Sequence, residues 1–368
     1  MDEIREQLRE SLGNSDRKKY NRLFAWGAGN TAALYLNGFE RIKIDGVSIE
    51  AYVDSKSDRW GQYIGDAPVI SPDDFYKCYD INALVLVMSI QPNVIREIGG
   101  MLDSRGVIWC SVDEYILSRY RDDVMRVYDL LDDEKSKKVY ADVVSTRMQR
   151  KNPSADIPEK CPYFCLPGFW GWQPNEIFVD CGAYVGDSVE AFIREYDGVF
   201  GRIYAFEPDK SNQKAFNCRV ERLKREWNIS DDRIKLIGRA VGKAESKSLV
   251  WAGDENNAGI GSKIAAGTDD SGDKIDVISL DLLLGEVDVS FIKADIESYE
   301  YDMLLGAKSV IRRRKPKLAV CIYHNTVDLF SIPLLIKEIC PEYRFSVRHH
   351  SNVQADTVLY AWVDDDGE

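Results

Sequence analysis

The first third of the chain alternates short apolar runs with amphipathic stretches. Four apolar runs predict strands, at Leu23–Trp26, Ile49–Asp54, Ala83–Ser89 and Val107–Cys110. The third run is apolar at nearly every position, which is typical of a parallel strand that is buried on both faces. Because strands that alternate with helices build parallel sheets, we expect residues 1–118 to form a small, parallel Rossmann-like α/β domain that opens with a charged helix.

Residues 119–160 have a different pattern, with dense charges and apolar positions at helical spacing. We predict two helices here that connect the first domain to the rest of the chain. The apolar positions that carry this prediction are Val124, Val127, Leu131, Val139, Val143 and Val144. A segment rich in proline and aromatic residues, Asn152–Gln173, begins within this connector and continues beyond it. We expect it either to pack on the next domain or to line the substrate pocket of that domain.

A second series of strands extends from Ile177 toward the end of the chain. Five runs predict parallel strands joined by helices, and two later runs predict a closing antiparallel pair. The strands are Ile177–Cys181, Gly201–Phe206, Ile234–Ile237, Val289–Ala294 and Lys317–Ile322, with Arg344–Arg348 and Thr357–Trp362 as the closing pair. This layout is that of the class I methyltransferase sheet, whereas a nicotinamide-binding Rossmann domain has a sixth parallel strand. We therefore predict an α/β fold with a mixed seven-stranded sheet for residues 161–368.

Helices are expected between the strands of this second domain. They are Asp187–Tyr196, Ser211–Trp227, Tyr299–Arg313 and Ile332–Cys340. Two more predicted strands, Ser246–Trp251 and Lys274–Ser279, flank a loop rich in glycine, asparagine and aspartate at Gly253–Gly272. We expect this loop to form a lid over the bound ligand. Its polar side chains include Asn256, Asn257 and Ser262.

Composition narrows the range of functions. The 368 residues carry a formal net charge of −13, which disfavours binding to the phosphate backbone of nucleic acids. The dense basic run Arg312–Lys315 suits a solvated helix C-terminus. The chain opens with alternating charges, and no apolar stretch reaches the length that spans a membrane. We therefore expect a cytoplasmic protein that binds no nucleic acid and has no membrane span.

Eight cysteines are scattered along the chain without a C-x-x-C pair. Several lie inside apolar, strand-like runs, which favours buried, reduced thiols over a disulfide framework. The closest pair, Cys161 and Cys165, has no second pair to complete the four ligands of a zinc site. We therefore expect no metal.

The segment Asp180–Asp187, DCGAYVGD, lies between an expected strand and an expected helix. Gly182 lets the backbone turn and approach a ligand closely, and Gly186 lets the start of the helix pack against the strand. Asp180 offers an acceptor to an amino group. S-Adenosylmethionine has an amino group and no pyrophosphate, so a loop with fewer glycines than the dinucleotide motif G-x-G-x-x-G suits it. The residues of this loop that we assign to the donor are Asp180, Gly182, Ala183, Gly186 and Asp187.

Acidic residues follow two other expected strands. Glu207 follows the second strand, where a carboxylate can accept hydrogen bonds from both ribose hydroxyls, and Pro208 fixes the turn. Asp295 and Glu297 follow the fourth strand, which brings them to the same edge of the sheet as Asp180. Carboxylates favour a neighbouring cation such as a sulfonium. We predict that Asp295 faces the methionine end of the donor or the acceptor hydroxyl.

Together these motifs resemble the FkbM-type methyltransferases, over about Tyr163 to Trp362. The motifs that carry the resemblance are Asp180–Asp187, Phe206–Pro208, Leu280–Asp281, Ile292–Glu300 and Gly306–Ala307. Ser298 stands where the family's usual K-x-D-x-E-G-x-E has glycine. The resemblance implies a class I fold, S-adenosylmethionine as the donor and mostly O-methylation of sugars or natural products. The N-terminal domain and its helical connector are also similar to those of longer members found with genes of polysaccharide biosynthesis.

All three histidines lie late in the chain. His324 follows the fifth strand, and a neutral imidazole at that edge could remove the proton of the acceptor hydroxyl. The alternative is a hydrogen-bonded structural histidine. His349 and His350 lie at an expected hairpin turn, where a surface pair is favoured. The assigned catalytic residues are Asp295 and His324, and the donor set is completed by Glu207, Pro208, Ala240 and Asp295.

The first domain carries a weaker signal. Gly27-x-Gly29-x-x-Ala32, followed by Asp54, fits the dinucleotide fingerprint in outline. This domain either binds a nucleotide or nucleotide-sugar, or docks a partner protein or a second copy of the chain as a homo-oligomer. The leading hypothesis is an S-adenosylmethionine-dependent O-methyltransferase acting on a small-molecule or glycan acceptor. The rivals are an NAD(P)-dependent sugar oxidoreductase and a non-catalytic binding or assembly protein.

Overall fold

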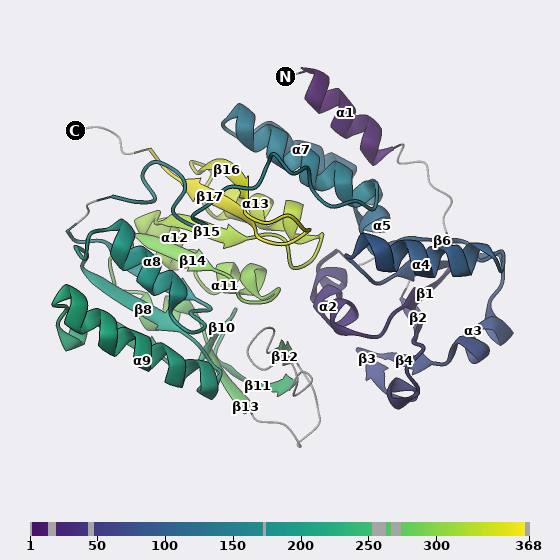
Figure 1. The fold of residues 1–368 in the computed structure, drawn as a ribbon, viewed down its shortest axis with the longest axis horizontal. Helices are drawn as coiled ribbons and strands as arrows, with labels where there is room; N and C mark the ends of the chain where they lie inside the picture. Colours follow the sequence, from purple (N-terminus) through teal and green to yellow (C-terminus); the bar gives the residue numbers. More distant parts are fainter. Residues whose placement is uncertain are drawn as a thin grey trace. The chain divides into compact units, whose positions relative to one another are not determined.

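A computed structural model describes residues 2–13, 20–42, 48–171, 174–251, 263–265 and 274–364. The chain forms two compact units that interleave along the sequence (Figure 1). Unit 1 consists of Met1–Pro158, Tyr323–Ser331 and Val347–Thr357. Unit 2 consists of Glu159–Ile322, Ile332–Ser346 and Val358–Glu368.

Unit 1 contains a six-stranded sheet in the order β3-β4-β2-β1-β5-β6. Its strands are β1 Arg22–Trp26, β2 Ile49–Val53, β3 Tyr63–Ile64, β4 Ala67–Ile70, β5 Ala83–Val87 and β6 Trp109–Ser111. All neighbouring pairs are parallel except the short hairpin β3–β4. The four expected strands are present. The hairpin was not predicted, because its first strand is only two residues long and its second contains Pro68.

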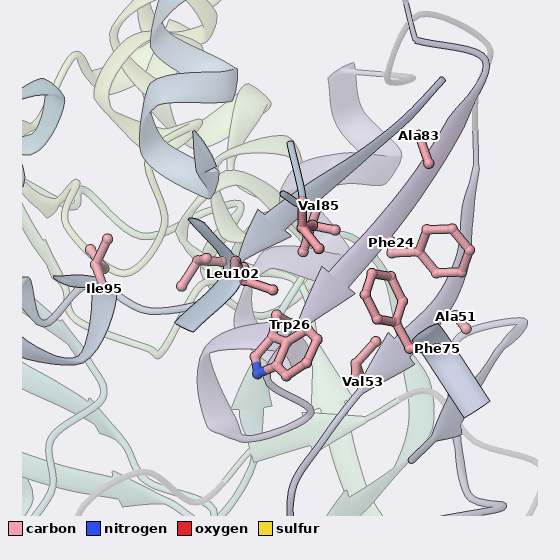
Figure 2. Close-up of a cluster of buried hydrophobic side chains, with 11 residues drawn as sticks. Phe24, Trp26, Ala51, Val53, Phe75, Ala83, Val85, Ile95 and Leu102 are labelled. Atoms are coloured by element: carbon pink, nitrogen blue, oxygen red, sulfur yellow. The ribbon is translucent and has the colours of Figure 1, made fainter. Parts of the chain in front are cut away.

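The core of unit 1 is built on β1 and β5 (Figure 2). Phe24 and Trp26 of β1 pack edge-on against Phe75, with ring centroids 5.2 and 5.4 Å apart. Val85 and Val87 of β5 complete the same cluster. Edge-to-face aromatic pairs add to the hydrophobic burial, so these residues fix the face of the sheet against which Phe75 packs.

Seven α-helices are described in unit 1 before Pro158. They are α1 Asp2–Leu12, α2 Asn30–Ile42, α3 Pro72–Cys78, α4 Pro92–Asp103, α5 Val112–Arg119, α6 Arg121–Leu130 and α7 Glu134–Met148. The two helices expected in the connector are present as α6 and α7, and α5 ends where this stretch begins. Ser111 and Glu114 form a capping box for α5, and Asp133 caps α7.

A buried polar cluster ties the two late segments of the chain into unit 1. Arg147 of α7 is fully buried and donates hydrogen bonds to the carbonyl oxygens of Tyr323 and Gln354, both at 3.2 Å. It also forms an ion pair with Asp113 at 3.4 Å, and Asp113 accepts a hydrogen bond from Thr326. One guanidinium group therefore holds both Tyr323–Ser331 and Val347–Thr357.

Unit 2 is built around a seven-stranded sheet in the order β16-β17-β15-β14-β7-β8-β9. Its strands are β7 Ile177–Cys181, β8 Arg202–Phe206, β9 Ile234–Ile237, β14 Phe291–Ala294, β15 Lys317–Cys321, β16 Arg344–His349 and β17 Thr357–Trp362. Strands β7, β8, β9, β14 and β15 run parallel, and β17 pairs antiparallel with β15. This sheet confirms the predicted class I fold, including the closing pair.

A second sheet has the order β10-β13-β11-β12. Its strands are β10 Ala240–Val241, β11 Ser246–Trp251, β12 Lys263–Ala265 and β13 Lys274–Ile278. The two strands predicted around the polar loop are thus present, but they belong to this separate sheet. Apart from β12, the expected lid Gly253–Gly272, with Asn256, Asn257 and Ser262, lies outside the described residues.

The helices of unit 2 are α8 Asp187–Glu195, α9 Lys210–Trp227, α10 Leu280–Leu284, α11 Glu300–Leu305 and α12 Lys308–Arg314, and α13 Asp328–Ile339 spans both units. Helices α8 and α9 lie side by side (Figure 1), where Glu190 forms ion pairs with Arg219 and Arg222 at 2.6 and 2.8 Å. The single helix expected over Tyr299–Arg313 is wrong. It breaks at Gly306, where an added Cβ would overlap the carbonyl oxygen of Gly242. In the part of the chain described, no helix is both long and apolar enough to cross a membrane.

Candidate donor-binding and active site

The turn Gly182–Gly186 connects the carboxyl end of β7 to α8. We call it the donor turn. Gly182 has φ +85°, and a Cβ at this position would overlap the carbonyl oxygen of Asp295. Gly186 has φ +83°, caps α8 and packs against Phe216, 3.0 Å from where its Cβ would lie. Both glycines are therefore required by backbone conformation and close packing. The predicted turn at Gly182 is confirmed, and its approach to a ligand stays a prediction. Gly186 packs on Phe216 of α9 rather than on the strand as expected.

Asp180 lies under the donor turn and is completely buried. One carboxylate oxygen is 3.0 Å from Nζ of Lys293, and the other accepts a hydrogen bond from the hydroxyl of Ser188. Both oxygens are thus engaged by neighbours in unit 2. A direct bond from Asp180 to the donor's amino group stays a prediction, and the contacts present give this carboxylate a structural role beneath the turn.

Lys293 of β14 is a buried cation that the sequence analysis missed. Its Nζ donates a 2.7 Å hydrogen bond to the carbonyl oxygen of Gly182. Burial lowers the pKa of Lys293, but the charges of Asp180 and Asp295 outweigh burial and raise the pKa above its ordinary value. The available signal was a lysine inside the apolar run FIKA, since a charge in a buried strand needs a partner.

Glu207 lies at the end of β8 and is buried beside the donor turn. Its carboxylate accepts hydrogen bonds from the backbone N–H groups of Tyr184 at 3.0 Å and Asp209 at 2.8 Å. Burial raises the pKa of Glu207, although these N–H donors oppose the rise. The peptide groups of Glu207 and Pro208 both accept from the side chain of Gln213. This acid is therefore fixed in direction at the edge of the sheet.

Asp295 follows β14 directly and lies against the opposite side of the donor turn. Its backbone N–H donates a 3.0 Å hydrogen bond to the carbonyl oxygen of Cys181. Its carboxylate accepts a 2.8 Å hydrogen bond from the hydroxyl of Tyr163. Because β7 lies between β14 and β8 in the sheet, the donor turn has Asp295 on one side and Glu207 on the other.

The segment after Asp295 forms a tight left-handed turn. Glu297 has φ +53° and Ser298 has φ +75°, a region that favours glycine. Glu300 closes the turn by accepting a 2.7 Å hydrogen bond from the N–H of Ile296. The glycine that the family usually has at position 298 is explained by this backbone conformation, which Ser298 adopts here at some cost in strain.

The remaining predicted donor residues have clear positions. Ala183 is buried in the donor turn, and its N–H donates to the carbonyl oxygen of Phe206 at 2.9 Å. Asp187 is the first residue of α8. Ala240 is buried in β10, which belongs to the four-stranded sheet. The structure thus brings the residues of β7, β8 and β14 to one edge, and it adds the exposed side chain of Tyr184, which the sequence analysis did not select.

The histidines belong to unit 1. His324 is buried in the segment after β15, with its ring 4.1 Å from that of Tyr323. Since Asp295 belongs to unit 2, the expected cooperation of His324 and Asp295 at the acceptor stays a prediction. The expectation of a surface pair at His349 and His350 is wrong for His349, which is fully buried and shares a 2.8 Å hydrogen bond with Thr357.

The glycine turn of unit 1, at Gly27 and Gly29, differs from the donor turn because the acid beside it is paired with an arginine. Asp54, at the end of β2, accepts hydrogen bonds from the N–H groups of Ala28 at 2.8 Å and Lys56 at 2.9 Å. It also forms a 2.8 Å ion pair with Arg59. Burial raises the pKa of Asp54, but these contacts outweigh burial and lower it. The acid that would bind a ribose in a dinucleotide fold is therefore occupied by an arginine of its own unit.

A family model described as the methyltransferase FkbM domain matches residues 180–344. The matched residues begin at Asp180 and include the donor turn, Glu207 and Asp295. No curated protein matches the chain.

Solved structures give a likeness of fold. The chain is similar to the crystal structure of a methyltransferase FkbM from Methylobacillus flagellatus KT, at 22% identity and a TM-score of 0.53, over 98% of this chain and 93% of that one. An rRNA methylase from Streptococcus thermophilus matches at 14% identity and a TM-score of 0.32, over 52% of this chain and 90% of that one. At this identity the first of these supports the fold alone.

Proposed function

We propose that the chain is a methyltransferase that uses S-adenosylmethionine to methylate a hydroxyl of a sugar, glycan or related natural product, because a family model of the methyltransferase FkbM domain matches residues 180–344. The observation that supports the donor is the donor turn, with Glu207 on one side and Asp295 on the other. A nucleoside and a cation joined in one molecule match these two carboxylates.

The residues of unit 2 fit such a donor. Glu207 is held with its carboxylate at the end of β8, where it accepts hydrogen bonds from the ribose hydroxyls. The forced conformation of Gly182 brings the backbone close to the ligand without a side chain between them. When bound, the donor supplies an activated methyl group on a sulfonium. The chain's part in catalysis is then to align the acceptor oxygen with that methyl group.

Methylation of a hydroxyl requires a base that accepts the proton of that hydroxyl. Asp295 and His324 are the two groups that we propose to face the acceptor, and His324 follows β15 by only three residues. A positioned base of this kind contributes about 10²–10⁴-fold to a rate.

Donor binding is tested by thermal unfolding of the whole chain with S-adenosylmethionine, S-adenosylhomocysteine or NADH. A ligand at about 100 times its Kd stabilises the protein by about 2.7 kcal/mol. We expect stabilisation by the first two and none by NADH, and we expect Glu207→Gln to weaken it. Stabilisation by NADH alone would instead favour the oxidoreductase, although the occupied carboxylate of Asp54 argues against that function.

The acceptor is tested with a panel of glycans, nucleotide-sugars and small natural products incubated with the protein and S-adenosylmethionine. The expected product is heavier than its acceptor by one CH₂ group and resists alkaline hydrolysis, as an ether does. A product that loses the added group in mild alkali would be an ester, which would contradict methylation of a hydroxyl. Binding of donor without transfer to any acceptor of the panel would favour a non-catalytic binding protein.

A further inference from the structure

The aromatic segment before β7, residues 161–171, is anchored in the core of unit 2 by two phenylalanines. Phe164 lies among the rings of Phe178, Phe192 and Phe291, with its centroid 5.9 Å from that of Phe291. Phe169 packs edge-on against Phe291 and Tyr360 at 5.5 and 5.1 Å. The sequence predicted that this segment either packs on the domain that follows it or lines the substrate pocket of that domain. Packing on that domain is confirmed for Phe164 and Phe169.

Tyr163 is held differently from its neighbours. Its φ is +71°, a conformation that is a strained outlier for a bulky residue. The buried ring of the adjacent Phe164 and a 2.9 Å hydrogen bond from the N–H of Tyr163 to the hydroxyl of Tyr360 hold the backbone in this conformation. Backbone strain that the surroundings enforce is concentrated at functional sites. Here its effect is to direct the phenol of Tyr163 away from the aromatic core and toward β14.

The phenol of Tyr163 contacts two charged residues, Lys293 in β14 and Asp295 directly after it. Its hydroxyl donates a 2.8 Å hydrogen bond to Oδ2 of Asp295. Its ring faces Nζ of Lys293, 5.2 Å from the ring centroid. Nζ of Lys293 is 3.0 Å from Asp180 and is also stabilised by the charge of Asp295, so one cation faces two carboxylates at this place. The carboxylate of Asp295, fixed by Tyr163, is thus a second negative charge beside the turn.

The order of strands assigns this carboxylate to one end of the proposed donor. Glu207 lies on the β8 side of the donor turn, where it suits the ribose. The methionine part therefore extends to the β14 side, where the backbone N–H of Asp295 donates to the carbonyl oxygen of Cys181, the residue before the turn. The sulfur of S-adenosylmethionine is positively charged, whereas the sulfur of the product, S-adenosylhomocysteine, is neutral. A carboxylate attracts a cation.

We infer, resting on the proposed function, that Tyr163 is a positioning residue that orients Asp295 toward the sulfonium and so makes the site prefer the charged donor over the neutral product. This preference has a function in turnover, because loss of the charge during methyl transfer weakens binding of the product and favours its release.

The test needs no acceptor, because it compares Kd values of the full chain for S-adenosylmethionine and S-adenosylhomocysteine by calorimetry. In Tyr163→Phe we expect the Kd for S-adenosylmethionine to rise about fivefold to tenfold, and that for S-adenosylhomocysteine by less than about twofold. Asp295→Asn should show the same selective loss. The double variant should bind no more weakly than Asp295→Asn, because Tyr163 acts through Asp295.

Tyr196→Phe is the matched control, since Tyr196 is a buried phenol of the same unit that donates to the carbonyl oxygen of Phe169. It should leave the ratio of the two Kd values unchanged. Equal loss for both ligands in Tyr163→Phe would show a merely structural role, and no loss for either would show no role, so both outcomes overturn the inference. Failure of the unaltered chain to bind either ligand would instead overturn the proposed function.

Discussion

Nζ of Lys293 lies 2.7 Å from the carbonyl oxygen of Gly182, and this bond joins the middle of β14 to the first residue of the donor turn. The same amino group is 3.0 Å from the carboxylate of Asp180 in the neighbouring strand β7. A single buried cation therefore fixes both the start of the donor turn and the acid below it. We therefore expect donor binding to depend on a residue that need not touch the donor.

Replacing Lys293 with Met should weaken donor binding and destabilise the fold together. Asp180 would be left as a buried charge without its partner, and breaking a buried pair costs about 3–5 kcal/mol. Urea unfolding measures the loss, and calorimetry with S-adenosylhomocysteine measures binding. We expect the double variant Asp180→Asn with Lys293→Met to regain much of the stability, because it no longer buries a charge, without regaining donor affinity.

Lys317→Met is a matched control for this prediction. Lys317 also lies in a strand of the seven-stranded sheet and forms a 3.0 Å ion pair with Glu176, but its other partners are Gly168 and Tyr196. It should lower stability without changing the Kd for S-adenosylhomocysteine. An equal loss of affinity in both lysine variants would show that binding follows global stability, contrary to a specific role for Lys293.

Gly182→Ala should abolish donor binding. The added Cβ would overlap the carbonyl oxygen of Asp295, and the backbone at φ +85° is unfavourable for alanine. Gly168→Ala separates these two effects, because Gly168 has a similar φ of +84° but no atom within 4 Å of an added Cβ. We expect Gly168→Ala to cost about 1–2 kcal/mol of stability and to leave the Kd unchanged. Near-normal binding by Gly182→Ala would mean that the turn is not a donor site.

Much of this site was predictable because its residues mark the ends of strands. Gly182, Glu207 and Asp295 each follow an apolar run, and parallel strands bring their carboxyl ends to one edge. Lys293 lies inside a strand rather than at its end, so its only local signal was a charge within an apolar run. Its partner, Asp180, comes from another strand, so their pairing depends on sheet order rather than on local sequence.

The interleaving of the two units could not be read from the sequence for a related reason. His324 and His349 are placed by contacts with residues more than a hundred positions earlier, such as those that Arg147 makes with Tyr323 and Gln354. Hydrophobic periodicity describes one element at a time and carries no information about such partners. The break at Gly306 was missed similarly, since it reflects a close approach to Gly242.

Arg147→Met should destabilise unit 1 by about 3–5 kcal/mol, because Asp113 would remain buried without its cation. Hydrogen exchange should increase in Tyr323–Ser331 and Val347–Thr357, the segments held by this guanidinium. Arg150→Met is the matched control: Arg150 lies three positions later and pairs with Glu114, but it is partly exposed, so its loss should cost about 0–1 kcal/mol. Unchanged exchange in Arg147→Met would contradict the role of Arg147 as the link to these segments.

His349 should make the stability of unit 1 depend on pH. Burial, with smaller contributions from the charges of Arg147 and His350, lowers the pKa of His349 from 6.5 to about 4. The folded state therefore keeps this imidazole neutral at pH values where the unfolded chain binds a proton. Its contribution to stability is complete above pH 6.5 and is lost as the pH falls toward about 4, by about 3 kcal/mol in total. Urea unfolding between these pH values should show the free energy of unfolding falling as the pH falls. His349→Gln should lack the part of this fall that comes from His349. A slope that is the same in both proteins would assign the pH dependence to other groups.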